Sequence, residues 1–80
     1  MRMKEAIVRR FQHLCQERGI KYNELATLSG VTPSTVYSMM DSSRKDVSVI
    51  TVKKLCDGLE ISIPAFFNDS LFDYLEQEIQ

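Results

Sequence analysis

The sequence feature that most restricts the fold of this chain is a glycine followed closely by a threonine-proline pair, Gly30 and then Thr32-Pro33. Glycine readily adopts the left-handed backbone conformation that ends many helices. A threonine side chain accepts a backbone N–H at a helix start, and proline in the first helical position costs no hydrogen bond. One helix is therefore predicted to end at Gly30 and another to begin at Pro33, with a very short turn between them. Gly19 is predicted to end an earlier helix in the same way.

Apolar residues recur every three or four positions on both sides of this turn, as expected for amphipathic helices. Helices are predicted over about residues 4–18, 22–29 and 33–40. Ser48 is predicted to cap a fourth helix, and Ser62 a short fifth one. The side chains expected on the buried faces of the five helices, in order, are Ile7, Phe11, Leu14 and Cys15; Leu25, Ala26 and Leu28; Val36 and Met39; Val49, Val52, Leu55, Cys56 and Leu59; and Phe66 and Phe67.

The size of the chain suits one small hydrophobic core, because it has 80 residues of which 44% are apolar. We therefore predict a compact all-α fold, with five helices within residues 1–68 and a short amphipathic helical segment over residues 69–80. That segment either packs back on the domain or meets the same segment of a second chain. Its apolar residues at helical spacing are Leu71, Phe72, Leu75 and Ile79.

The chemistry-bearing residues argue against an enzyme and against a bound cofactor. Cys15 and Cys56 lie far apart and both fall on apolar faces, which favours reduced core thiols over a disulfide. The single histidine, His13, is expected on the surface and completes no set of zinc ligands. No acid pair with a plausible cleft and no phosphate-binding loop is visible. No apolar run has membrane-spanning length and no signal-peptide segment is present, so a cytoplasmic protein is expected.

The net charge of −1 conceals an asymmetry along the chain. All four charged residues from position 69 onward are acidic, which leaves ten basic and seven acidic side chains, or +3, in residues 1–68. A basic body with an acidic tail is compatible with nucleic-acid binding, although charge alone fits a solvated helical surface equally well. Arg9 and Arg10 in particular are expected on a solvated face.

Two short helices joined by a tight turn match the helix-turn-helix motif. In that motif the second helix enters the major groove of DNA, and its amino-terminal residues face the base edges. Side chains in the groove have to be compact and able to donate and accept hydrogen bonds. The residues of the third helix that meet both needs are Ser34, Thr35, Tyr37 and Ser38.

The stretch YNELATLSGVTPSTVYSMM, residues 22–40, resembles the helix-turn-helix of the Cro/phage-repressor proteins, also known as XRE-type or lambda-repressor-like. A second stretch, VSVITVKKLCDGLEISIPAFF, residues 47–67, resembles the fourth and fifth helices of that family. The resemblance covers roughly residues 4–68. Its matching pieces are Glu24-Leu25-Ala26, Gly30-Val31-Thr32 and Ser34-Thr35-Val36.

This resemblance implies a helix-turn-helix DNA-binding domain over residues 1–68 that binds double-stranded operator DNA, commonly as a homodimer. The third helix would provide most of the DNA contacts, Tyr22 would stand where many members contact a phosphate, and Arg44 and Lys45 would lie in a loop that often meets the backbone. The DNA-binding residues implied in this way are Tyr22, Thr32, Pro33, Ser34, Thr35, Tyr37, Ser38, Arg44 and Lys45.

Two functions follow from these observations. The leading hypothesis is a sequence-specific transcriptional regulator of repressor or Cro type, in a bacterium or its phage. The alternative is an antitoxin-like or adaptor protein whose C-terminal segment binds a partner protein through Leu71, Phe72, Leu75 and Ile79. RNA binding is disfavoured, because the aromatic residues do not form a stacking surface.

Overall fold

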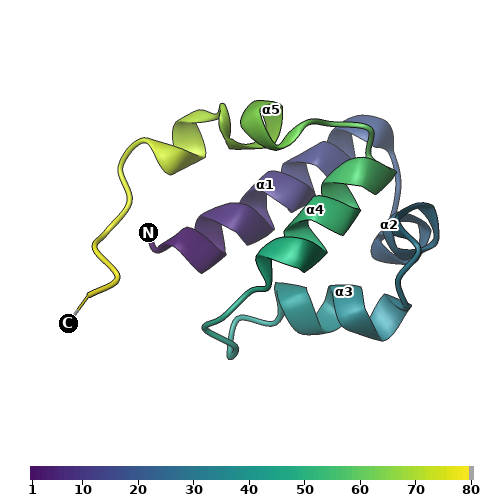
Figure 1. The fold of residues 1–80 in the computed structure, drawn as a ribbon, viewed down its shortest axis with the longest axis horizontal. Coiled ribbons are helices and arrows are strands. Elements are labelled where there is room, and N and C mark those ends of the chain that lie inside the picture. Colours follow the sequence, from purple (N-terminus) through teal and green to yellow (C-terminus); the bar gives the residue numbers. More distant parts are fainter. Residues whose placement is uncertain (80) are drawn as a thin grey trace.

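The computed structural model describes residues 1–79 and contains five α-helices followed by one turn of 3-10 helix, as Figure 1 shows. The expected all-α fold of five helices is therefore confirmed. The elements are α1 (Met3–Arg18), α2 (Tyr22–Ser29), α3 (Pro33–Met40), α4 (Val49–Gly58), α5 (Ile63–Phe67) and the 3-10 turn η1 (Ser70–Phe72).

The helix starts follow the local signals in the sequence. The Thr32 side chain accepts from the backbone N–H of Thr35, and the Ser62 side chain accepts from that of Ala65. Ser48 caps α4, with Oγ accepting from two successive backbone N–H groups. Each cap satisfies donors that a helix leaves unpaired in its first turn. All three predicted N-caps are therefore confirmed.

The turn between α2 and α3 depends on Gly30. Its φ of 68° lies in the left-handed region, and the N–H of the next residue, Val31, donates to the carbonyl of Ala26 at 3.1 Å. This geometry satisfies the last carbonyls of α2 while reversing the direction of the chain. Gly19 ends α1 in the same way, with a φ of 63°.

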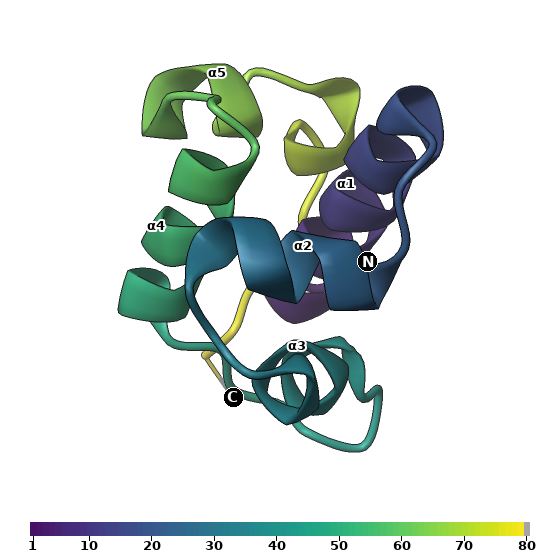
Figure 2. The ribbon, with the colours of Figure 1, turned by 90° about the vertical axis from the view of Figure 1, so that its right-hand side faces the viewer.

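Helix α2 connects the helix-turn-helix to the rest of the domain. It packs against α3 on one side and against α4 on the other, and in Figure 2 it crosses in front of α1 and α4 with α3 below it. Side chains from all five helices fill one core between them. The buried members of that core are Ile7, Phe11, Leu14, Cys15, Leu25, Ala26, Val36, Met39, Val52, Leu55, Cys56, Leu59 and Phe66.

Two residues expected in the core are exposed instead. Leu28 is 57% exposed, because α2 turns Leu25 and Ala26 inward and leaves Leu28 on its flank. Val49 is 70% exposed, because it is the first residue of α4 and the core begins only at Val52. Helical spacing identified the buried faces but not how far each face is covered by neighbouring helices.

Arg10 also differs from the expectation, because it belongs to the fold and not to a solvated face. Its guanidinium donates to the carbonyls of Phe66 and Ala65 at 2.8 and 3.1 Å, at the end of α5. It also lies 3.3 Å from a carboxylate oxygen of Asp69 and over the ring of Phe66. Arg9, by contrast, forms an exposed ion pair within α1, as expected for a solvated residue.

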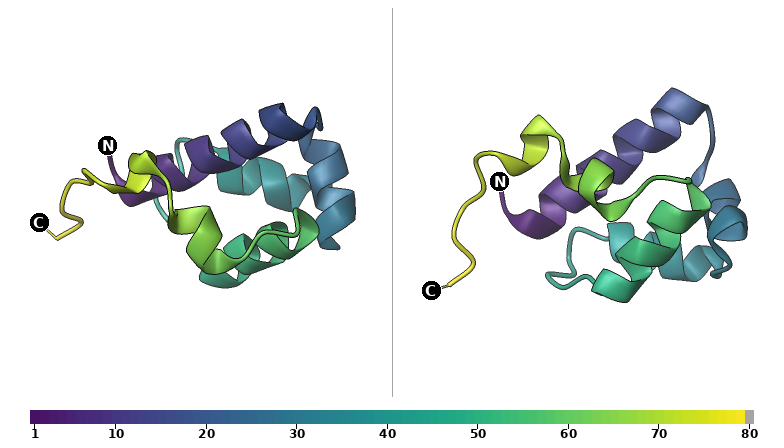
Figure 3. Two further views of the ribbon diagram at one scale, coloured as in Figure 1. Left: turned by 90° about the horizontal axis from the view of Figure 1, so that it is seen from above. Right: turned by 45° about the horizontal axis from the view of Figure 1, so that its top comes forward.

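The C-terminal segment forms a single helical turn and not a longer amphipathic helix. After η1 the chain runs without regular helix to Ile79, alongside the start of α1, and Figure 3 shows both termini at the same end of the molecule. The ring of Phe72 packs against Phe66 and Phe67, at centroid distances of 5.9 and 4.9 Å. Leu71 and Leu75 are half-buried, whereas Ile79 is 81% exposed. Gln80, the last residue of the predicted segment, lies outside the described residues.

The two cysteines are free and buried in the core, as expected, and His13 is on the surface. Over residues 1–79, none of the helices is both long enough and apolar enough to cross a membrane.

Candidate nucleic-acid interface

The start of α3 carries a cluster of three hydroxyl groups. Thr32 Oγ1 lies 3.0 Å from Ser34 Oγ and 2.9 Å from Thr35 Oγ1. Thr32 Oγ1 also accepts the backbone N–H of Thr35 at 3.3 Å. Because each hydroxyl both donates and accepts, such a cluster can rotate its protons to suit a donor or an acceptor on a ligand.

The buried side of α3 determines which of its residues face outward. Val36 and Met39 are 0% and 6% exposed and pack into the core. The opposite side of the helix must therefore face outward, since a helix places residues three or four apart on one face. The predicted contact residues on this outward side are Pro33, Ser34 and Tyr37, which are exposed, and Thr35 and Ser38, which are half-buried. None of them carries a formal charge.

Tyr22 and Tyr37 bring the two helices of the motif together at the surface. Their rings meet edge to face, with centroids 5.5 Å apart and an interplanar angle of 75°. Tyr22 is half-buried at the first position of α2, whereas Tyr37 is 53% exposed. The structure therefore joins two predicted contact residues that lie fifteen positions apart in the chain.

A shallow hollow beside these rings contains polar residues that sequence reasoning did not single out. It is lined by Gln12 and Gln16 of α1 and by Lys21, in addition to Tyr22 and Tyr37. Gln12 and Gln16 are four residues apart, so their spacing already placed them on one face of α1. What the sequence did not reveal is that this face borders the start of α2.

Arg44 and Lys45 lie apart from the tyrosines, in the exposed loop that follows α3. The loop opens with a turn in which the Asp41 carboxylate accepts from the N–H and the hydroxyl of Ser43, both at 2.9 Å. These two hydrogen bonds lower the pKa of Asp41. Lys4 of α1 secures the loop, because its Nζ donates to the carbonyls of Asp41 and Arg44 at 3.1 and 2.7 Å.

The predicted contact residues thus occupy three places: the start of α2 and the outward face of α3, which meet at Tyr22 and Tyr37, and the loop after α3. A comparison with protein-family models matches residues 10–65 to the Cro/C1-type HTH DNA-binding domain. The match covers more than half of the chain and includes the whole of α2, α3 and α4. The chain belongs to the Cro/C1-type helix-turn-helix family.

Membership of the Cro/C1-type family confirms the resemblance inferred from the sequence and identifies the chain as a DNA-binding regulator in general terms. Such DNA-binding domains are typically not enzymes. Among curated proteins and among solved structures, the comparison finds no significant match to this chain. The matched segment leaves out the first turns of α1 and everything after residue 65.

Proposed function

We propose that this Cro/C1-type domain is a sequence-specific transcriptional repressor that reads operator DNA in the major groove with α3. The observation that supports the proposal most strongly is the outward face of α3. It is capped by Thr32, held in place by the buried Val36 and Met39, and lined with short hydroxyl side chains. A helix of this kind fits the major groove, where base edges present distinct patterns of donors and acceptors.

The proposed contacts divide into base readout and backbone attachment. Thr32, Ser34, Thr35, Tyr37 and Ser38 would offer hydrogen bonds to base edges, and Pro33 would shape the start of the helix without offering a donor. Backbone attachment would come from the residues that flank α3, namely Tyr22, Arg44 and Lys45.

We also propose that the repressor acts as a homodimer on a two-fold symmetric operator. A single eight-residue helix contacts few base pairs, and helix-turn-helix proteins gain specificity by placing two such helices in half-sites about 34 Å apart. The adaptor function is less favoured, because only Ile79 of its four proposed contact residues is largely exposed.

The experiment that tests this function is selection of duplexes from a genomic-fragment library, followed by fluorescence anisotropy with the selected sequence. Ser34→Ala and Tyr37→Ala are each expected to weaken binding to the selected duplex about tenfold, the usual scale of one lost base contact. Their affinity for an unrelated duplex is expected to change little, because phosphate contacts remain.

Ser70→Ala is a matched control, since Ser70 is an exposed serine in η1 and not in the helix-turn-helix. The proposal is wrong if no duplex is retained at low salt. It is also wrong if Ser34→Ala and Tyr37→Ala bind the selected duplex as tightly as Ser70→Ala does.

A further inference from the structure

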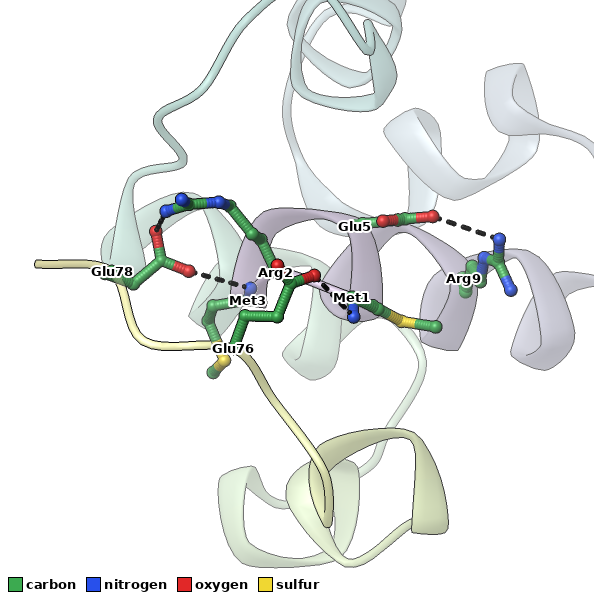
Figure 4. Close-up of polar contacts among 7 residues, drawn as sticks. All are labelled: Met1, Arg2, Met3, Glu5, Arg9, Glu76 and Glu78. Atoms are coloured by element: carbon green, nitrogen blue, oxygen red, sulfur yellow. Dashed lines mark hydrogen bonds and ion pairs between the residues drawn. The ribbon is translucent and has the colours of Figure 1, made fainter. Parts of the chain in front are cut away.

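The acidic tail is attached to the first residues of the chain by four polar contacts, most of which Figure 4 shows. The α-amino group of Met1 lies 2.9 Å from a carboxylate oxygen of Glu76, and the Glu76 N–H donates to the Met1 carbonyl at 3.1 Å. Arg2 donates to one oxygen of Glu78 at 3.3 Å, and the Met3 N–H donates to the other at 3.1 Å. The two glutamates therefore neutralise the amino terminus and Arg2.

Glu78 lies in a hollow that is otherwise mainly basic. The hollow is formed by the start of α1 and by the loop after α3, and its charged lining residues are Arg2, Lys4, Glu5, Arg44, Lys45 and Glu78. The backbone N–H of Met3 adds the positive end of the α1 helix dipole. The Glu78 carboxylate thus occupies a place that favours an anion, directly beside the loop that carries Arg44 and Lys45.

The attachment of the tail is weak, because it depends on exposed polar contacts. The side chains of Glu76 and Glu78 are 63% and 57% exposed in their ion pairs. Two neighbouring large side chains, Tyr74 and Ile79, are 91% and 81% exposed and add little buried area. Exposed ion pairs contribute little to stability and are screened by salt. A polyanion such as duplex DNA, with one charge per about 1.7 Å, can displace a contact of this kind.

We propose that the acidic tail competes with the DNA backbone: Glu76 and Glu78 hold the amino terminus and Arg2 until phosphates of a duplex bound at α3 replace them. The inference depends on the proposed DNA-binding role of α3 and adds an internal regulator to it. Glu76, Glu78, Arg2 and the amino terminus all lie outside the residues that match the family. The competition therefore depends on residues of this chain outside the matched segment.

Measurement of duplex affinity in the full chain tests the competition. The double variant Glu76→Gln/Glu78→Gln is expected to bind a short duplex about threefold to tenfold more tightly than the unaltered chain, the scale of two exposed ion pairs. Its affinity is also expected to fall more steeply as the salt concentration rises, because up to two further cationic groups of the protein, the amino terminus and Arg2, contact phosphates. Glu17→Gln/Glu60→Gln is the control, since it removes the same charge from exposed residues distant from Met3 in the chain.

An NMR titration of the labelled chain with the same duplex separates the two proposals. As α3 signals shift on binding, the Met3 amide signal is expected to move toward its position in the Glu76→Gln/Glu78→Gln variant. If α3 signals shift while the Met3 amide stays unchanged, or if both double variants bind alike, the competition is refuted and the DNA-binding role stands. If no α3 signal shifts with any duplex, the DNA-binding role fails and the competition fails with it.

Discussion

Gly58 of α4 and Ser29 of α2 approach so closely that a Cβ on residue 58 would lie 2.2 Å from Ser29 Oγ and 2.9 Å from Ser29 Cα. The second distance involves backbone, which cannot rotate away as a side chain can. The Ser29 hydroxyl at this crossing is buried and has no hydrogen-bond partner among residues 1–79. The contact between α2 and α4 therefore requires glycine at position 58, and it sets where the helix-turn-helix lies relative to the domain body.

Gly58→Ala is expected to destabilise the protein by about 1–3 kcal/mol, the usual cost of forcing extra volume into a packed site. Without the clash, alanine in a helix would stabilise by up to about 1 kcal/mol relative to glycine, so the sign of the change is decisive. Urea denaturation measures it. Asp57→Ala, at the exposed preceding position, is the control and is expected to change stability by no more than about 0.5 kcal/mol. A variant Gly58→Ala as stable as the unaltered chain would refute the close approach.

Glu60→Gly is expected to stabilise the protein by about 0.5–1 kcal/mol. Glu60 follows α4 with a φ of 57° and is, among residues 1–79, the non-glycine residue with a positive φ. The left-handed conformation is unfavourable for residues with a Cβ, and glycine removes that cost. Glu60→Ala keeps the Cβ and is expected to give no comparable gain. The midpoints of urea denaturation compare the two variants, and equal midpoints would contradict the role of backbone strain.

Arg10→Lys is expected to destabilise the protein by about 1–3 kcal/mol, although it preserves the charge. The planar guanidinium reaches two carbonyls and the Asp69 carboxylate at once, and an ammonium group cannot reproduce that geometry. Arg9→Lys is the matched control, since Arg9 is half-exposed and pairs only with Glu5 among the described contacts. Thermal or urea denaturation distinguishes the two, and equal losses would show that Arg10 has no special role.

Much of the fold could be predicted because its signals are local. The caps at Thr32, Ser48 and Ser62 and the left-handed Gly30 depend on a few consecutive residues, so the helix bounds followed closely from sequence. The exposure of Val49 could not be predicted in this way, because it depends on how far along α4 the core extends.

In the candidate site too, some features follow from consecutive residues, whereas others depend on how distant parts of the chain pack together. The outward face of α3 follows from helical spacing once Val36 and Met39 are placed in the core. The pairing of Tyr22 with Tyr37 depends instead on the angle between α2 and α3, which is set by the Gly30 turn. The grouping of Arg44 with Arg2 likewise depends on where the loop after α3 meets the start of α1, a contact between residues distant in sequence.

The pair of tyrosines is expected to contribute to stability as a unit. Tyr22→Leu and Tyr37→Leu should each be destabilising, and the double variant should lose about 0.5–1.5 kcal/mol less than the sum of the two, the coupling typical of an aromatic pair. Urea denaturation of the four proteins gives this coupling energy. Tyr37→Phe keeps the ring contact and is the control for loss of the hydroxyl. Additive losses would show that the two rings do not support each other.

The Cys56 thiol is expected to be unreactive in the folded protein at pH 8. Burial away from water, followed by the adjacent Asp57 carboxylate, raises its pKa to about 11, and the thiolate is the nucleophilic form. The raised pKa means that folding favours the protonated thiol. The stability that this thiol contributes is therefore fully present below the pKa of an exposed thiol, about 8.5, and is lost as the pH rises through about 11.

A Cys15→Ala variant leaves Cys56 as the reporting thiol, and a disulfide reagent at pH 8 measures its reaction rate. The rate is expected to be that of a free thiol multiplied by the small fraction of molecules that are open, and to reach the full free-thiol rate only in denaturant. Urea denaturation between pH 8 and 11 completes the test: the Cys15→Ala variant should lose stability across this range, and Cys15→Ala/Cys56→Ala should lose less. Rapid reaction of Cys56 in the native state would contradict its burial in the core, where it is 0% exposed.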